Sequence, residues 1–117
     1  MSTMLEATIE KYLITRVEAA GGIAIKLFPK FVAGLPDRLV VLPGRFIEFV
    51  ELKAPGGRLR PVQRRFHKRL AALGIVVLVI ASKAEVDELL QMWIMTNRRF
   101  GVSSLEMLIR QNEIETE

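Results

Sequence analysis

The sequence predicts a single α/β domain, because helical and strand-like patterns alternate along all 117 residues without an intervening linker. Apolar residues recur at helical spacing over residues 5–20, whereas the runs 38–53 and 75–81 are rich in Val, Ile, Leu and Phe, as is typical of strands. Half of the residues are hydrophobic, which is ordinary for a folded domain and excludes a disordered chain. We therefore expect residues 1–117 to form one domain around one core.

The first helix is expected to run from a cap at Ser2 to about Ala20, where Gly21-Gly22 ends it. At about 100° per residue, Glu6 and Glu10 both fall on the apolar side of this helix, where a solvated charge is not expected. The alternative for either residue is a favourable charge near a helix amino terminus. The two glutamates are therefore candidates for a buried role.

Three strands are expected next, over residues 23–28, 38–42 and 45–53. Pro43-Gly44 forms a short turn between the second and third strands, which predicts an antiparallel hairpin. This hairpin can bring the residues that precede its second strand beside those that end its third, although the sequence does not fix the register.

The carboxyl-terminal half is expected to contain helices and one further strand. Pro61 suits the first turn of a helix that extends to about Leu73, and Gly74 closes it. The apolar run 75–81 is typical of a buried strand. The remaining expected elements are a helix capped by Ser82 and Glu85 and ending near Met95, a loop over residues 96–101, and a last helix capped by Ser103 and Glu106.

The charge distribution is uneven, although the net charge is only +4. Residues 1–51 hold six basic and six acidic side chains, residues 52–84 hold eight basic and no acidic ones, and residues 85–117 hold three basic and seven acidic ones. A positive block suggests a polyanionic partner such as nucleic acid; a solvated helix face is the alternative. The candidate phosphate contacts are Arg58, Arg60, Arg64, Arg65, Lys68 and Arg69, with Lys26 on the first strand as a weaker one.

Several classes of site and location are excluded or disfavoured. The chain has no cysteine, which excludes disulfides, zinc–cysteine sites and thiol catalysis. The single histidine, His67, is expected at the surface or facing nucleic acid, because no second histidine exists to share a metal site. No run approaches the ~18 apolar residues of a membrane span, and no signal peptide is apparent. We therefore expect a cytoplasmic protein without a membrane partner.

Glu51 and Lys53 are the most distinctive pair, because residues two apart on a strand point to one face. If the hairpin brings Asp37 beside Glu51, two carboxylates and an ammonium group converge at the strand ends. Carboxylates so close repel one another unless a cation bridges them. Mg²⁺ or Mn²⁺ is the natural bridge, since these ions take oxygen ligands and often only two carboxylates. The alternative is an exposed salt bridge between Glu51 and Lys53.

The combination of motifs resembles a known family. The dipeptide "PD" at 36–37 is followed by "ELK" at 51–53, with a glutamate-bearing helix before them and "PVQ" at 61–63 after them. This order resembles the PD-(D/E)XK nuclease superfamily and, within it, the virus-type replication-repair nuclease (VRR-NUC) domain, over residues 6 to about 90. The resemblance implies a restriction-endonuclease-like core of a helix, a three-stranded mixed or antiparallel sheet, a helix and a strand, followed by carboxyl-terminal helices. The expected helical extension over 96–117 lies outside the resemblance.

The resemblance also implies a set of site residues and a metal cofactor. Carried over position by position, it assigns metal binding to Asp37, Glu51 and one glutamate of the first helix, and catalysis to these residues together with Lys53 and Gln63. The first-helix glutamate is expected to be Glu10, with Glu6, one turn earlier, as the alternative. Gln63 lies at the edge of an apolar helix face, so it either reaches into the site or is an exposed helix glutamine. The implied cofactor is Mg²⁺ or Mn²⁺.

By the same resemblance, the chain is expected to be a metal-dependent endonuclease that hydrolyses DNA phosphodiester bonds. Branched DNA, such as Holliday junctions or flaps, is the implied substrate, in replication, recombination or repair in a bacterial or phage-infected cytosol. Nucleases of this type commonly act as homodimers, and the apolar segment 88–95 agrees, although packing on the chain's own sheet explains it equally. The alternatives are a non-catalytic DNA-binding module and a nuclease subunit that depends on a helicase partner.

Overall fold

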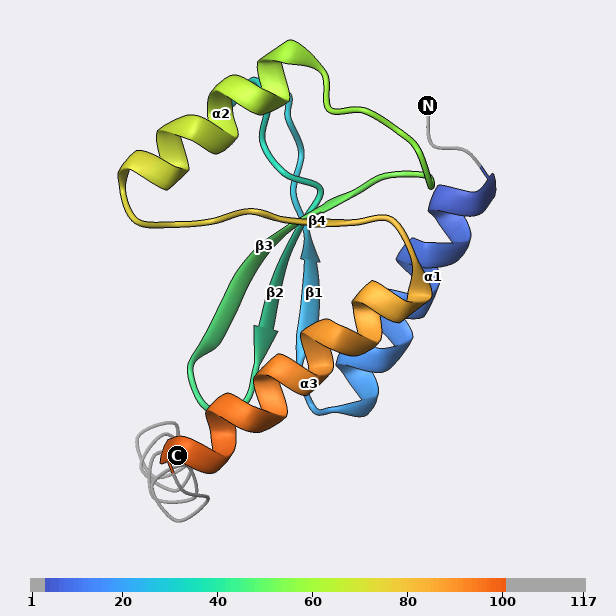
Figure 1. Cartoon of the computed structure of the whole chain (residues 1–117), viewed down its shortest axis with the longest axis vertical. Helices are drawn as coiled ribbons and strands as arrows, with labels where there is room; N and C mark the ends of the chain where they lie inside the picture. Colours follow the sequence, from blue (N-terminus) through green and yellow to red (C-terminus); the bar gives the residue numbers. More distant parts are fainter. Residues whose placement is uncertain (1–3, 101–117) are drawn as a thin grey trace, which may run out of the picture.

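A computed structural model describes residues 4–100 of the chain. For Met4 and residues 98–100 it describes the backbone only. The elements are α1 (Met4–Ala19), β1 (Ile23–Lys26), β2 (Arg38–Leu42), β3 (Phe46–Leu52), α2 (Pro61–Ala72), β4 (Leu78–Ile80) and α3 (Lys83–Phe100). The strands form one sheet in the order β1-β2-β3-β4, in which β4 runs parallel to β3 and the other pairs are antiparallel. The expected α/β fold and its hairpin are therefore confirmed (Figure 1).

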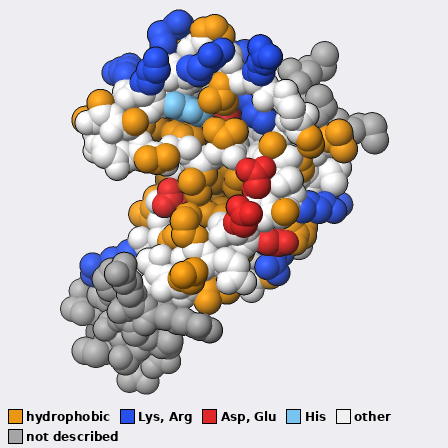
Figure 2. Space-filling model, viewed as in Figure 1, with side chains coloured by type: hydrophobic (Ala, Val, Ile, Leu, Met, Phe, Trp, Pro, Cys, Tyr) orange, Lys and Arg blue, Asp and Glu red, His pale blue; other side chains and the backbone are white. Residues whose placement is uncertain are grey.

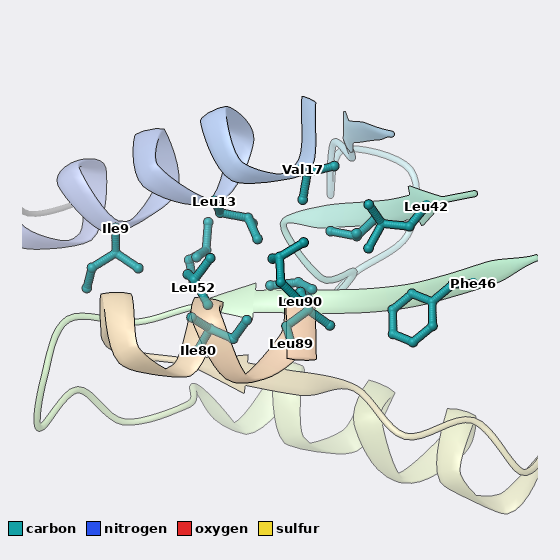
Figure 3. Close-up of a cluster of buried hydrophobic side chains, with 12 residues drawn as sticks. Ile9, Leu13, Val17, Leu42, Phe46, Leu52, Ile80, Leu89 and Leu90 are labelled. Carbon is teal, nitrogen blue, oxygen red and sulfur yellow. The ribbon is translucent and has the colours of Figure 1, made fainter. Parts of the chain in front are cut away.

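Helices α1 and α3 pack together over one face of the sheet. The core lies between them and the strands, and Figure 3 shows its side chains pointing toward one another while α2 stays outside the cluster. The cluster consists of Ile9, Leu13, Val17, Val40, Leu42, Phe46, Val50, Leu52, Ile80, Val86, Leu89 and Leu90. Because a fully buried side chain of this kind contributes about 1.5–3 kcal/mol, this layer supplies most of the stability of the fold.

The opposite face of the sheet is largely open to solvent. Residues paired across neighbouring strands share a face, so Ile23, Val41 and Ile47 form one row across β1, β2 and β3. Ile23 is 55% exposed and Ile47 is 59% exposed. This apolar face is therefore not covered by the described part of the chain.

The strand β4 is shorter and more exposed than its sequence predicts. The run 75–81 was expected to be a buried strand, whereas β4 has three residues at the edge of the sheet. Ile75 and Val76 are exposed, and only Val77 and Ile80 of this run are buried. The prediction of a buried strand is wrong for most of this run, because the described residues leave the outer side of this edge strand partly uncovered. The strand β1 likewise ends at Lys26, two residues earlier than expected.

Helix α3 continues to Phe100, although the sequence predicts a loop over residues 96–101. No glycine or proline interrupts the chain within this helix. The Trp93 indole N–H also donates a 2.7 Å hydrogen bond to the Pro43 carbonyl, which ties the helix to the β2–β3 turn. The predicted loop is therefore wrong at these positions.

The start of α3 follows the expected capping pattern. The Glu85 backbone N–H donates a 3.1 Å hydrogen bond to Ser82 Oγ. The last helix, expected to begin at Ser103, lies outside the described residues. Among residues 4–100, no helix combines the length and the apolar character that crossing a bilayer requires.

Candidate active site

Asp37 and Glu51 meet at the end of the β2–β3 hairpin. The register pairs Arg38 with Val50, so the residues that flank this pair are neighbours at the strand ends. The Leu52 backbone N–H donates a 2.7 Å hydrogen bond to Asp37 Oδ2. This bond fixes the Asp37 carboxylate against the end of β3, on the same side as Glu51.

Glu51 is a buried carboxylate with one oxygen satisfied and one free of partners. Its side chain is only 1% exposed. The Gln63 amide donates a 2.6 Å hydrogen bond to Glu51 Oε1, whereas Glu51 Oε2 is buried without a hydrogen-bond partner among the described residues. Burial, together with the nearby Asp37 carboxylate, raises the pKa of Glu51 to about 7.

Lys53 lies on the same side of β3 as Glu51. Lys53 Nζ is 3.9 Å from Glu51 Oε1, and the Lys53 side chain is only 16% exposed. The salt bridge of the alternative reading is therefore present, but it is largely buried, so only the exposed position expected for it is wrong. The ammonium group instead sits at the wall of a cleft, next to a carboxylate that is hidden from solvent.

The Gln63 side chain is held in one orientation at both ends. It is only 5% exposed, so the alternative of an exposed helix glutamine is wrong. The Arg60 backbone N–H donates a 2.8 Å hydrogen bond to Gln63 Oε1, which leaves Gln63 Nε2 as the donor toward Glu51. The first turn of α2 thus presents an N–H group to the buried carboxylate.

Close contact between α2 and the loop before β2 positions that first turn. Gly34 has φ +82°, and a Cβ atom at this position would lie 2.3 Å from the Val62 carbonyl oxygen. Only glycine permits both this backbone conformation and this approach. The segment "GLPD" therefore brings Asp37 and the start of α2 to the same end of the sheet.

A cleft of about 420 Å³ opens over these residues. It is lined by Glu6, Glu10, Lys26, Leu27, Phe28, Pro29, Asp37, Glu51, Lys53, Arg60 and Gln63. The structure therefore brings all the residues with a predicted catalytic role to one cleft, together with two of the seven predicted phosphate contacts, Lys26 and Arg60.

The two glutamates of α1 differ in their surroundings. Glu10 Oε2 is 3.3 Å from Arg38 Nε, and both side chains are largely buried. Glu6 has its pKa raised by burial first and then by the Asp37 carboxylate. Glu6 also contributes to raising the pKa of Glu51. Glu6 is therefore the α1 carboxylate that interacts electrostatically with the Asp37–Glu51 pair, while Glu10 is neutralised by an arginine.

Arg38 is a site residue that sequence reasoning missed. It donates hydrogen bonds to Glu10 and to the Ala24 carbonyl, 3.0 Å away. The available signal was its place directly after Asp37, because successive strand residues point to opposite faces and Arg38 therefore points toward α1. Phe28, which lines the cleft, was also not singled out.

The predicted phosphate contacts outside the cleft form an exposed basic row. Figure 2 shows Lys and Arg side chains gathered along α2 at the edge of the molecule. Arg58, Arg64, Arg65, Lys68 and Arg69 are all exposed. Solvent exposure agrees with phosphate binding and with a solvated helix face alike.

His67 is less exposed than expected. The residue is half-buried and its Nε2 is buried without a hydrogen-bond partner among the described residues, so the expected surface position holds only in part, and a position facing nucleic acid stays a prediction. Burial and, to a smaller extent, the Lys53 charge lower the pKa of His67. The reason is its place one helical turn after Gln63, on the same inward side of α2.

Comparisons with known proteins agree with this geometry. The chain is 48% identical over 83 residues to "Putative nuclease p44" of Acyrthosiphon pisum secondary endosymbiont phage 1, covering 71% of this chain and 89% of the phage protein. A solved structure described as "VRR_NUC domain" superposes with a TM-score of 0.69 at 38% identity, covering 76% of this chain and 97% of that one. No family model matches the chain.

Fold, cleft and comparisons together define a nuclease domain. The chain belongs to the VRR-NUC family, as its motifs predict.

Proposed function

We propose that this domain is a Mg²⁺- or Mn²⁺-dependent endonuclease that cleaves DNA at branches such as Holliday junctions or flaps, in cytoplasmic replication, recombination or repair. The observation that carries the proposal is Glu51 Oε2, a buried carboxylate oxygen that has no hydrogen-bond partner within residues 4–100 and lies near a second carboxylate, Asp37. Such a pair costs stability in the free protein, and a bound cation offsets that cost. The arrangement is therefore suited to holding a positive ion.

The residues present fit a hard divalent ion. Asp37 and Glu51 would hold it, because Mg²⁺ is commonly bound by one or two carboxylates and keeps several waters or phosphate oxygens. No group of three or more Asp, Glu, His or Cys side chains within residues 4–100 is arranged to hold a metal, so the proposed site rests on these two carboxylates. The ion would polarise the scissile phosphate and lower the pKa of the attacking water.

The remaining cleft residues have distinct proposed roles. Lys53, beside Glu51, contacts the scissile phosphate or the attacking water and stabilises the charge that develops during cleavage. Gln63 holds Glu51 Oε1 and leaves Oε2 directed to the ion. For the glutamate of α1 we favour Glu6 over Glu10, because Glu6 shares the field of the carboxylate pair while Glu10 is engaged by Arg38.

The basic row along α2 continues from the cleft and supports DNA binding beside it. Arg60 lines the cleft, and the exposed side chains Arg64, Arg65, Lys68 and Arg69 follow it on the same helix. Contacts of this kind neutralise phosphates without reading sequence, which suits an enzyme that recognises DNA shape. Arg58, which precedes the helix, extends the same basic row.

We also propose that residues 1–117 form a single domain that acts as a homodimer. The support is the uncovered sheet face, where Ile23, Ile25 and Ile47 are 55%, 40% and 59% exposed. Contiguous exposed apolar surface of this kind marks association sites in soluble proteins. Two sites in one dimer would cut the two strands of a branched DNA.

Cleavage of a labelled DNA panel tests the proposed function. Single-stranded, duplex, flap, splayed-arm and four-way-junction DNA are incubated with Mg²⁺, with Mn²⁺ or with a chelator. We expect cleavage of branched DNA with either metal, none with the chelator, and none by Asp37→Asn. Binding without any cleavage would contradict the proposal and favour a DNA-binding module or a subunit that needs a helicase.

A further inference from the structure

The loop between β1 and β2 presents two phenylalanine rings to solvent. Phe28 is 66% exposed and Phe31 is 87% exposed. An exposed ring forfeits the hydrophobic stabilisation that a core position would give, and it adds nothing to the packing of the described fold. The stability of the fold therefore does not explain why two such rings are exposed within four residues.

Each ring has a lysine beside it. Lys26 Nζ lies 5.8 Å from the centroid of Phe28, and Lys30 Nζ lies 5.6 Å from the centroid of Phe31. At these distances the ammonium groups are attracted to the rings and held near them. The loop thus offers two aromatic surfaces, each with a positive charge at its side.

The loop is anchored at the active-site end of the sheet. The Leu27 backbone N–H donates a 2.9 Å hydrogen bond to the Asp37 carbonyl, which closes the loop at its base. Phe28 lines the cleft that also contains Glu51 and Lys53. A nucleic acid with one phosphate in the cleft would therefore pass this loop.

We infer that Phe28 and Phe31 form a stacking platform for unpaired nucleobases beside the cleavage site, with Lys26 and Lys30 contacting the adjoining phosphates. The inference rests on the proposed function and names the feature of the substrate that the domain recognises. Bases inside a duplex are already stacked, whereas unpaired bases at a branch expose their faces. Stacking on an aromatic side chain accepts any base, so the platform selects DNA structure and not sequence.

The chemistry of the loop favours nucleic acid over a second protein chain. The open sheet face offers mainly aliphatic side chains, such as Ile23 and Ile47, with the half-buried Phe49 beside them, and none of the three lines the cleft. The loop instead combines aromatic rings with cations, the combination by which proteins hold single strands. We therefore separate the platform from the proposed dimer face.

Binding to splayed-arm DNA, with and without bases in the unpaired arms, tests the inference. Abasic arms keep every phosphate but remove the stacking faces. The parent chain should bind the base-containing DNA more tightly. Phe31→Leu and Phe28→Leu, which keep an apolar side chain, should each weaken this binding by roughly fivefold to a hundredfold and leave binding to abasic DNA within about twofold. Phe31→Tyr should bind like the parent.

A matched control and the oligomeric state complete the test. Leu73→Ala removes an apolar side chain that is 77% exposed and does not line the cleft, and it should leave both affinities unchanged. The inference is overturned if Phe31→Leu weakens binding to abasic and base-containing arms equally. It is also overturned if the Phe31→Leu substitution dissociates a dimer in sedimentation. If the parent cleaves branched DNA but does not distinguish the arms, the inference fails alone. If the parent neither binds nor cleaves DNA, the proposed function fails.

Discussion

Gln63 joins helix α2 to the buried carboxylate of Glu51 by a hydrogen bond of 2.6 Å from Nε2 to Oε1. Its carbonyl oxygen in turn accepts the Arg60 backbone N–H, at 2.8 Å. The amide therefore cannot rotate without losing one of two buried bonds. Glu51 is left with one oxygen held and one oxygen, Oε2, that has no hydrogen-bond partner in the described part of the chain.

Replacing Gln63 by Leu should affect both stability and rate. Loss of the donor leaves Glu51 Oε1 unsatisfied, which should lower the free energy of unfolding by about 1–3 kcal/mol. The pKa of Glu51 should rise further, because a hydrogen bond to the charged form is lost, so the pH profile of cleavage should shift upward. Denaturant unfolding and cleavage rates across pH measure the two effects. Gln91→Leu, an exposed glutamine of α3, is the control; an unshifted pH profile in Gln63→Leu would contradict the role.

The Glu51 pKa predicts a pH-dependent stability in the absence of metal. Its folded value of about 7 exceeds the ordinary 4.5, so the unfolded chain releases this proton first as the pH rises. The folded state consequently loses stability between those two values. Glu51→Gln removes the loss and should be more stable than the parent above pH 7, by at most about 3–4 kcal/mol, since one pKa unit corresponds to about 1.4 kcal/mol.

Thermal unfolding with a chelator, at about pH 8 and about pH 4.5, measures this difference. The advantage of Glu51→Gln should be present at the higher pH and absent at the lower one. Added Mg²⁺ should stabilise the parent and not the variant, because ligand binding stabilises only a chain that retains its site. If Glu51→Gln were less stable than the parent at the higher pH, the ionised Glu51 carboxylate would not destabilise the folded chain, which would contradict this prediction.

Glu6 and Glu10 can be separated by paired substitutions. Glu6→Gln should slow cleavage on the order of tenfold or more, because it removes a charge near the carboxylate pair. Glu10→Gln should leave the rate largely unchanged and cost about 1 kcal/mol of stability, because it breaks the pair with Arg38. Single-turnover rates and denaturant midpoints of both variants provide the comparison. The reverse order of rates would support the sequence-based choice of Glu10.

The basic row on α2 predicts a salt effect. Arg64→Ala combined with Arg65→Ala should weaken binding to all DNA sequences and flatten the dependence of affinity on salt, because fewer counterions are released. Arg45→Asn combined with Lys11→Ala removes the same charge from exposed positions outside the cleft lining and is the matched control. Equal salt slopes for the two double variants would show that DNA binds to a surface other than the basic row on α2.

The sequence predicts the site better than it predicts the sheet. Asp37 and Glu51 are brought together by a hairpin whose turn the sequence predicts at Pro43-Gly44, and the structure supplies the register that the sequence leaves open. Burial of the run 75–81 is different, because it depends on whether another layer covers that face. Apolar residues are equally apolar in a core and at an uncovered face, and no local pattern distinguishes the two.

The sequence offers little basis for choosing between Glu6 and Glu10, for a related reason. Both residues lie on the apolar side of one helix, and helical geometry alone does not separate them. What separates them is Arg38, a residue on another element that pairs with Glu10. A tertiary contact of this kind depends on how α1 lies against the sheet, which propensities and periodicity do not specify.

The measurement that tests the central claim most directly is single-turnover cleavage by Lys53→Ala, at saturating enzyme and metal, alongside a DNA-binding titration. Lys53 contacts Glu51 at the wall of the cleft, so its proposed role is in the transition state and not in affinity. We expect nearly unchanged binding of DNA and metal, and cleavage slowed by on the order of a hundredfold or more. Equal cleavage rates for Lys53→Ala and the parent would contradict this expectation and reduce Glu51 and Lys53 to a structural pair at the end of a strand.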